Sequence, residues 1–156
     1  MYLRCSEKAT RTQQKQFEKT IEKFKTYVGT AYDRSGDLLG LFENLVTPVI
    51  TKPENVDLSS TTTTDLQREI FKQDVAEYIK ARNKLHTNLV ALYEVIWGQC
   101  SKSMKTKLQG LSEYETIKSS KDCAALLLHI KAICHKFDSA ISLYDAVDDA
   151  MVFLSS

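Results

Sequence analysis

The side chains best suited to chemistry in this sequence are four cysteines and three histidines, and their spacing matches no known zinc or thiol-redox pattern. They are Cys5, Cys100, Cys123 and Cys134, with His86, His129 and His135. Cys134 and His135 are adjacent, but neighbours on a helix point about 100° apart and do not converge on one ion. A metal site built from Cys123, His129, Cys134 and His135 stays open as an alternative to histidines with no ligand role.

The acidic residues and glycines also lack catalytic arrangements. Two close acidic pairs, Asp148 with Asp149 and Glu113 with Glu115, have no neighbours that would push their pKa values apart, as paired catalytic carboxylates require. The glycines form neither a GxxxxGK[ST] nor a GxGxxG phosphate loop. The sequence therefore predicts a protein that is not an enzyme and that binds no cofactor or small-molecule substrate.

Positive charge gathers in one short segment that could contact RNA. Lys102, Lys105 and Lys107 lie within six residues, and lysine ammonium groups bind phosphate. The alternative is a cluster that only aids solubility, since the net charge of the whole chain is +1. Residues 1–30 carry a net charge of +4 and residues 137–156 a net charge of −4, so the two ends either attract each other or form solvated helix faces.

The cysteines and the hydropathy pattern also indicate a compartment. No secretory signal precedes the cysteines, which favours free thiols in a reducing environment. No apolar run approaches the roughly 18 residues that a membrane span requires. We therefore expect a cytoplasmic protein without a membrane partner.

The element that dominates the sequence is one amphipathic stretch from Thr64 to Gln99. It contains neither proline nor glycine before Gly98, and its 36 residues are about three times an ordinary helix. Thr64 and Gln67 have the spacing of a capping box. A break is possible between Asn83 and Asn88, where weak helix formers occur. The expected buried stripe comprises Phe71, Val75, Tyr78, Leu85, Leu89, Leu92 and Ile96.

Shorter helices are predicted on both sides of this stretch. They cover residues 7–28, ending at Gly29, then 37–46, 102–109, ending at Gly110, then 121–136, capped by Ser120, and a last one from 138 or 139 onward. Residues 114–119 are expected to form a loop. The sequence thus predicts an all-α protein of five or six helices with one long central helix. Its expected parts are an N-terminal helical arm (1–47), a Ser/Thr/Pro linker (48–63) and a helical body (64–156).

Several short segments of this predicted body have a recognisable residue order. They are IWGQC at 96–100, MKTKL at 104–108, YETI at 114–117 and DCAALLLHIK at 122–131, with FKTYVGT at 24–30 and GD at 36–37 upstream. These segments resemble the Gag region of copia-type LTR retrotransposons over about residues 20–137. The resemblance implies a capsid-like, all-helical structural protein that assembles with copies of itself around the RNA of the element.

The resemblance also implies features that this sequence does not carry. Many such Gag proteins have a downstream zinc knuckle, and the pattern CxxCxxxxHxxxxC does not occur here. We therefore expect only weak RNA contact, through Lys102, Lys105 and Lys107, and a chain that is a fragment, a degenerate copy or a domesticated remnant.

Self-association through helical surfaces is the leading functional hypothesis. Its candidate contact residues are Trp97, Met104, Tyr144, Val147 and Met151, whose apolar side chains could be buried between subunits. For Trp97 the residue type favours the alternative, a core anchor of the monomer. The alternative function is a non-enzymatic helical adaptor that binds a partner protein helix in a groove.

Overall fold

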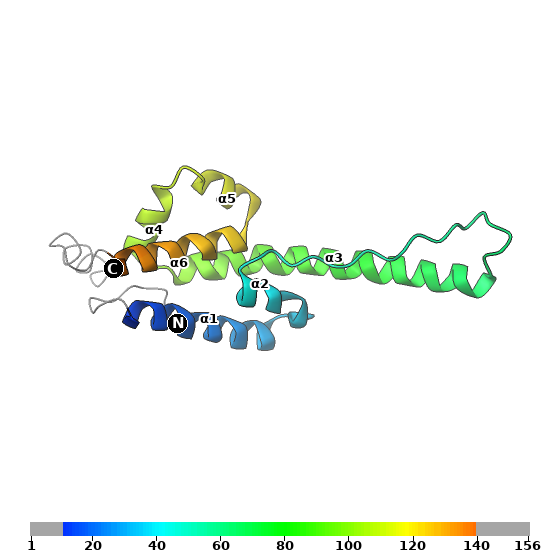
Figure 1. Ribbon diagram of the computed structural model, residues 1–156, viewed down its shortest axis with the longest axis horizontal. Coiled ribbons are helices and arrows are strands. Elements are labelled where there is room, and N and C mark those ends of the chain that lie inside the picture. Colours follow the sequence, from blue (N-terminus) through cyan, green and yellow to red (C-terminus); the bar gives the residue numbers. More distant parts are fainter. Residues whose placement is uncertain (1–10, 140–156) are drawn as a thin grey trace.

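The computed structural model describes the backbone of residues 11–139, and it is all-α, as predicted. Figure 1 shows a bundle from which one long helix projects. That helix is α3 (Asp65–Gln99), 35 residues long and unbroken, so the possible interruption between Asn83 and Asn88 does not occur. Asn88 is instead buried, and its Nδ2 donates a hydrogen bond to the Asp33 carbonyl oxygen at 2.9 Å. This bond ties the middle of α3 to the loop that follows the first helix.

The start of α3 follows from the predicted capping box. Thr64 Oγ1 accepts a hydrogen bond from the Gln67 backbone N–H at 3.1 Å, and Gln67 Oε1 accepts one from the Thr64 N–H at 2.9 Å. Two of the N–H groups that a helix start leaves without partners are thereby satisfied. The prediction of this helix from Thr64 to Gln99 is therefore confirmed to within one residue at its start.

The N-terminal helices pack against the C-terminal one. Helix α1 (Arg11–Ala31) contacts α6 (Cys123–Ser139), and the short 3-10 helix η1 (Ser35–Leu38) leads into α2 (Leu39–Asn44) beside them. The end predicted for the first helix at Gly29 is wrong, because α1 continues to Ala31. The predicted start of this helix, near Glu7, lies outside the described residues. The expected single helix over 37–46 is divided into η1 and α2, and Leu45 ends α2 with a φ of 53°.

One hydrophobic cluster joins the elements on both sides of the linker. Phe24 of α1 stacks on Phe42 of α2, with ring centroids 6.4 Å apart and an interplanar angle of 13°. Both rings belong to the same cluster as the C-terminal half of α3 and the inner faces of α4 and α6. Its largest fully buried members are Phe24, Leu38, Leu41, Leu92, Ile96, Met104, Leu108, Leu126, Leu127 and Ile130.

Two short helices connect α3 to α6. Helix α4 (Lys102–Gln109) has the predicted bounds, with Ser101 Oγ accepting from the Met104 N–H at its start and Gly110 at its end. The loop predicted at 114–119 is wrong, because these residues form α5 (Tyr114–Ser120), which buries Tyr114 and Ile117. The predicted cap of the next helix is also wrong: Asp122 Oδ1 accepts from the Ala125 N–H at 3.0 Å, and the helix begins at Cys123 rather than Lys121.

The linker runs along α3 to the far end of that helix and there turns into the start of α3. No helix or strand occurs in residues 45–64, which run beside α3 to its far end in Figure 1. Asp57 organises the turn there, since its carboxylate accepts from the Ser59 N–H at 2.9 Å and its carbonyl oxygen from Thr63 Oγ1 at 2.8 Å. These bonds return the chain to the start of α3. The predicted last helix, from 138 or 139 onward, lies mostly outside the described residues.

Candidate interaction surfaces

The first candidate surface is the part of α3 that projects beyond the bundle, residues 65–80, here called the α3 extension. Ala81 is the first buried residue of α3, so no side chain of the extension is fully buried. Phe71, Val75 and Tyr78, which were predicted to be buried, are only half-buried. The reason is that only the extended linker segment covers this side of the helix, whereas Leu85, Leu92 and Ile96 belong to the hydrophobic cluster shared with other helices.

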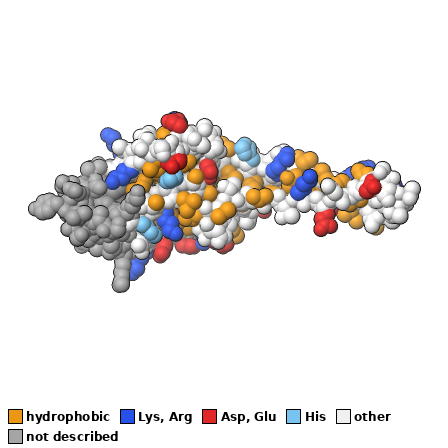
Figure 2. All heavy atoms as spheres, turned by 45° about the horizontal axis from the view of Figure 1, so that its top comes forward, with side chains coloured by type: hydrophobic (Ala, Val, Ile, Leu, Met, Phe, Trp, Pro, Cys, Tyr) orange, Lys and Arg blue, Asp and Glu red, His pale blue; other side chains and the backbone are white. Residues whose placement is uncertain are grey.

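The α3 extension has two opposite faces. Phe71, Val75 and Tyr78 share the linker side, where a shallow groove of about 360 Å³ lies between α3 and linker residues Pro53 and Val56. The opposite face follows a spacing of three and four residues, and all of its members are exposed: Leu66, Glu69, Gln73, Ala76 and Lys80. Figure 2 shows charged side chains of both signs interspersed with hydrophobic ones along this projecting end.

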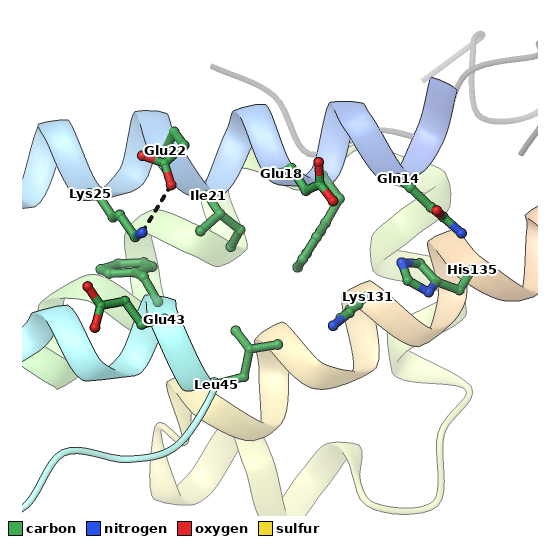
Figure 3. A pocket seen from close by; sticks show the side chains of 11 residues that line it. Gln14, Glu18, Ile21, Glu22, Lys25, Glu43, Leu45, Lys131 and His135 are labelled. Carbon is green, nitrogen blue, oxygen red and sulfur yellow. Dashed lines mark hydrogen bonds and ion pairs between the residues drawn. The ribbon is translucent and has the colours of Figure 1, made fainter. Parts of the chain in front are cut away.

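A second candidate surface is a groove of about 610 Å³ between α1, α2 and α6. Figure 3 shows Gln14, Glu18 and Ile21 of α1 above it, Lys131 and His135 of α6 below it, and Leu45 at the end of α2. Phe17, Ile21 and Phe42 give it an apolar floor and are themselves buried members of the core. The groove is therefore a shallow continuation of the hydrophobic cluster.

The rim of this groove carries both charges. Lys25 Nζ and Glu22 Oε1 form an ion pair at 3.0 Å, marked in Figure 3, and the rim also bears Glu18, Glu43 and Lys131. The side chain of His135 lies beside that of Gln14 at the other end. No cysteine lines the groove among the described residues, so it does not join His135 to a thiol. An apolar floor with a charged rim suits a peptide side chain or an amphipathic helix.

The third candidate surface surrounds Trp97 at the end of α3. Its ring is half-buried, lies 5.6 Å from the ring of Tyr114 and has Lys105 Nζ 5.7 Å from its centroid. Lys102 is exposed, whereas Lys105 and Lys107 are half-buried, so the three lysines differ in their access to a polyanion. Lys105 shields part of the indole, which leaves Trp97 in contact with the core and with solvent.

The remaining residues proposed for assembly are placed differently. Met104 is completely buried in the hydrophobic cluster, so the folded monomer offers none of its side chain to a second copy. Tyr144, Val147 and Met151 lie outside the described residues. Of the two candidate residues that the structure describes, Trp97 is therefore the one whose side chain is partly exposed and could contact a second copy.

The cysteines and histidines that the structure describes are not assembled into a metal site. Cys100, Cys123 and Cys134 are buried thiols, and Cys123 Sγ donates a hydrogen bond to the Leu89 carbonyl oxygen at 3.1 Å. In the described part of the chain, no three His, Cys, Asp or Glu side chains group as metal ligands would. This disfavours the metal site considered for Cys123, His129, Cys134 and His135, all of which are described.

No family model, curated protein or solved structure matches this sequence. Among the described residues, none of the helices has both the length and the hydropathy to cross a membrane. The interpretation of the three surfaces therefore depends on their own geometry and chemistry.

Burial of the thiols has a measurable consequence for stability. Desolvation raises the pKa of Cys100 from its ordinary value of 9.0 to about 12, and it raises the pKa of Cys123 to about 12 as well. The unfolded chain releases these protons near pH 9, while the folded chain keeps them until near pH 12. We therefore expect the free energy of unfolding to fall as the pH rises through this window, by up to about 1.4 kcal/mol per pH unit and thiol.

Urea unfolding measured at several pH values above 9 tests this expectation. The control is the double variant Cys100→Ala/Cys123→Ala, whose unfolding free energy is compared by its slope against pH and not by its absolute value. The slope should be shallower in the variant. Equal slopes in the two proteins would show that the thiols titrate alike in the folded and unfolded chains.

Proposed function

We propose that this protein is a structural, Gag-like protein that associates with copies of itself. The observation that carries the proposal is the α3 extension, which leaves the bundle and packs mainly against the linker, with an ion pair between Glu77 and Arg34 at its inner end. A helix without tertiary contacts is marginally stable in water, because most helical stability in proteins comes from packing of one face. A projecting helix of this kind gains stability from a second surface, and the resemblance to copia-type Gag regions suggests that identical subunits supply it.

The expected association is modest in strength. Leu66 is 69% exposed and Ile70 is 49% exposed, and these are the exposed large apolar side chains at the outer end of α3. Each can bury only a small apolar area, at about 25 cal/mol per Å² before the costs of association. Weak individual contacts suit assemblies in which each subunit makes several of them.

A concentration series with the 156-residue chain tests self-association. Light scattering coupled to size-exclusion chromatography should give a mass that rises with protein concentration. A mass that stays at one 17.7 kDa chain at every concentration would refute the proposal. The same series with a non-specific single-stranded RNA, compared with the variant Lys102→Glu/Lys105→Glu, tests the weaker proposal that these lysines contact phosphate.

The adaptor function is the second candidate, and the groove between α1, α2 and α6 favours it. Its volume and apolar floor suit part of an amphipathic partner helix. A strict monomer whose Lys131→Glu variant, at the exposed rim of the groove, loses binding to such a helix would favour the adaptor. Concentration-dependent particles that form equally well with this variant would favour assembly through another surface.

A further inference from the structure

The outer part of α3, residues 65–84, has a charge pattern that is complementary to itself. Residues 65–77 contain four carboxylates and two cationic side chains, a net charge of −2, whereas residues 78–84 contain three cationic side chains and no acid, a net charge of +3. The helix therefore changes sign along its length. Two such helices side by side attract each other when antiparallel and repel each other when parallel.

The side chains on the exposed face allow a close approach of two helices. Leu66, Glu69, Gln73, Ala76 and Lys80 alternate spacings of three and four residues, which is the spacing of a seam between supercoiled helices. All five are exposed, and they lie opposite the linker side of the helix. The middle of the face holds the uncharged Gln73 and the small Ala76, so neither charge nor bulk separates two helices there.

We infer that the α3 extensions of two copies pair antiparallel through this face, with Glu69 of each copy beside Lys80 of the other. The two residues are eleven positions apart, about 17 Å along one side of the helix. A two-fold axis near residues 74 and 75 brings both Glu69–Lys80 contacts together and sets Gln73 against Ala76. The inference rests on the proposed self-association and specifies its surface, partner and direction.

The pairing also fits the contacts within one copy. Arg34 Nη1 bonds Glu77 Oε1 at 2.5 Å, and Lys84 Nζ lies 3.6 Å from Asp33 Oδ2, so these charges are engaged with the bundle. Glu69 and Lys80 are exposed, and Lys80 lies one helical turn before Lys84. Glu69 is exposed, and within residues 11–139 its carboxylate accepts only a long hydrogen bond, 3.5 Å, from Gln73 Nε2, which leaves it accessible to a second helix.

Charge-reversal variants of the 156-residue chain test this arrangement. Glu69→Lys places a lysine at both positions 69 and 80, and Lys80→Glu places a glutamate at both. In an antiparallel pair, each single variant therefore turns both Glu69–Lys80 contacts into contacts between like charges. We expect either variant to weaken self-association about tenfold and the double variant Glu69→Lys/Lys80→Glu to restore it. The readout is the association constant from sedimentation velocity, and added salt should weaken the wild type and the double variant alike.

The controls are Lys23→Glu on α1 and Glu115→Lys on α5, which change the same charges at exposed positions of other helices. Circular dichroism should show unchanged helix content in every variant. Oligomers that persist undiminished in both single variants would overturn the antiparallel pair while leaving self-association intact. Single variants that weaken association without rescue by the double variant would also overturn it, and a wild type that is monomeric throughout would refute both proposals.

Discussion

Replacing Phe24 with alanine should lower the free energy of unfolding by about 3–5 kcal/mol, as removal of a buried phenylalanine commonly does. The Phe24 side chain is completely buried and stacks on Phe42, so its loss removes this aromatic contact between α1 and α2. The surrounding helices are fixed by other members of the cluster and cannot close the cavity fully. Urea unfolding followed by circular dichroism at 222 nm, the usual helix signal, measures the loss.

The matched control for Phe24→Ala is Val49→Ala in the linker. Val49 is 85% exposed, so removing its methyl groups should change the unfolding free energy by less than about 0.5 kcal/mol. The comparison also tests whether the N-terminal helices belong to one cooperative unit with the body. Two separate unfolding transitions, of which only the earlier responds to Phe24→Ala, would contradict a single shared core.

The elements that could be predicted from the sequence are those whose signals are local. Thr64 and Gln67 satisfy each other's backbone within one turn, so the start of α3 is encoded in four residues. Ser101 and Gly110 bound α4 in the same way. Signals of this kind do not depend on the rest of the chain, and the structure follows them.

The wrong predictions concern helices whose ends are formed by residues that do not normally end or begin a helix. Lys121 ends α5 with a φ of 53°, a left-handed conformation in which glycine is the expected residue. Without that glycine, α5 was missed, although the three-residue spacing of the buried Tyr114 and Ile117 could have indicated it. The side chain of Asp122 then caps α6, a role that the sequence suggested for Ser120.

The candidate surfaces were less accessible from the sequence than the helices. The groove of Figure 3 brings Gln14 from the start of α1 together with His135 near the end of α6, and no local pattern reports such a contact. The exposed face of the α3 extension was obscured for another reason. The apolar stripe through Phe71, Val75 and Tyr78 dominates the periodicity, and only the position of the linker shows that the opposite face is uncovered.

Substitution of Met104 can show whether this side chain stabilises the folded monomer or a contact between copies. The sequence suggested it as an assembly contact, whereas the structure buries it completely beside Leu108 and the inner face of α6. We therefore expect Met104→Ala to lower the unfolding free energy by about 2–5 kcal/mol. If the side chain stabilises only the monomer, this loss should be the same at low and high protein concentration, because only contacts between copies make stability depend on concentration.

The control for Met104→Ala is Lys102→Ala at the exposed start of the same helix, which should leave stability within about 0.5 kcal/mol of the wild type. Unfolding curves at two protein concentrations, together with sedimentation of the folded variant, separate the two roles. An unchanged monomer stability with weakened association would place Met104 at a contact between copies and would require α4 to rearrange on assembly. A large, concentration-independent loss would instead assign the methionine to the core, and assembly would then depend on surfaces such as the α3 extension that folding leaves uncovered.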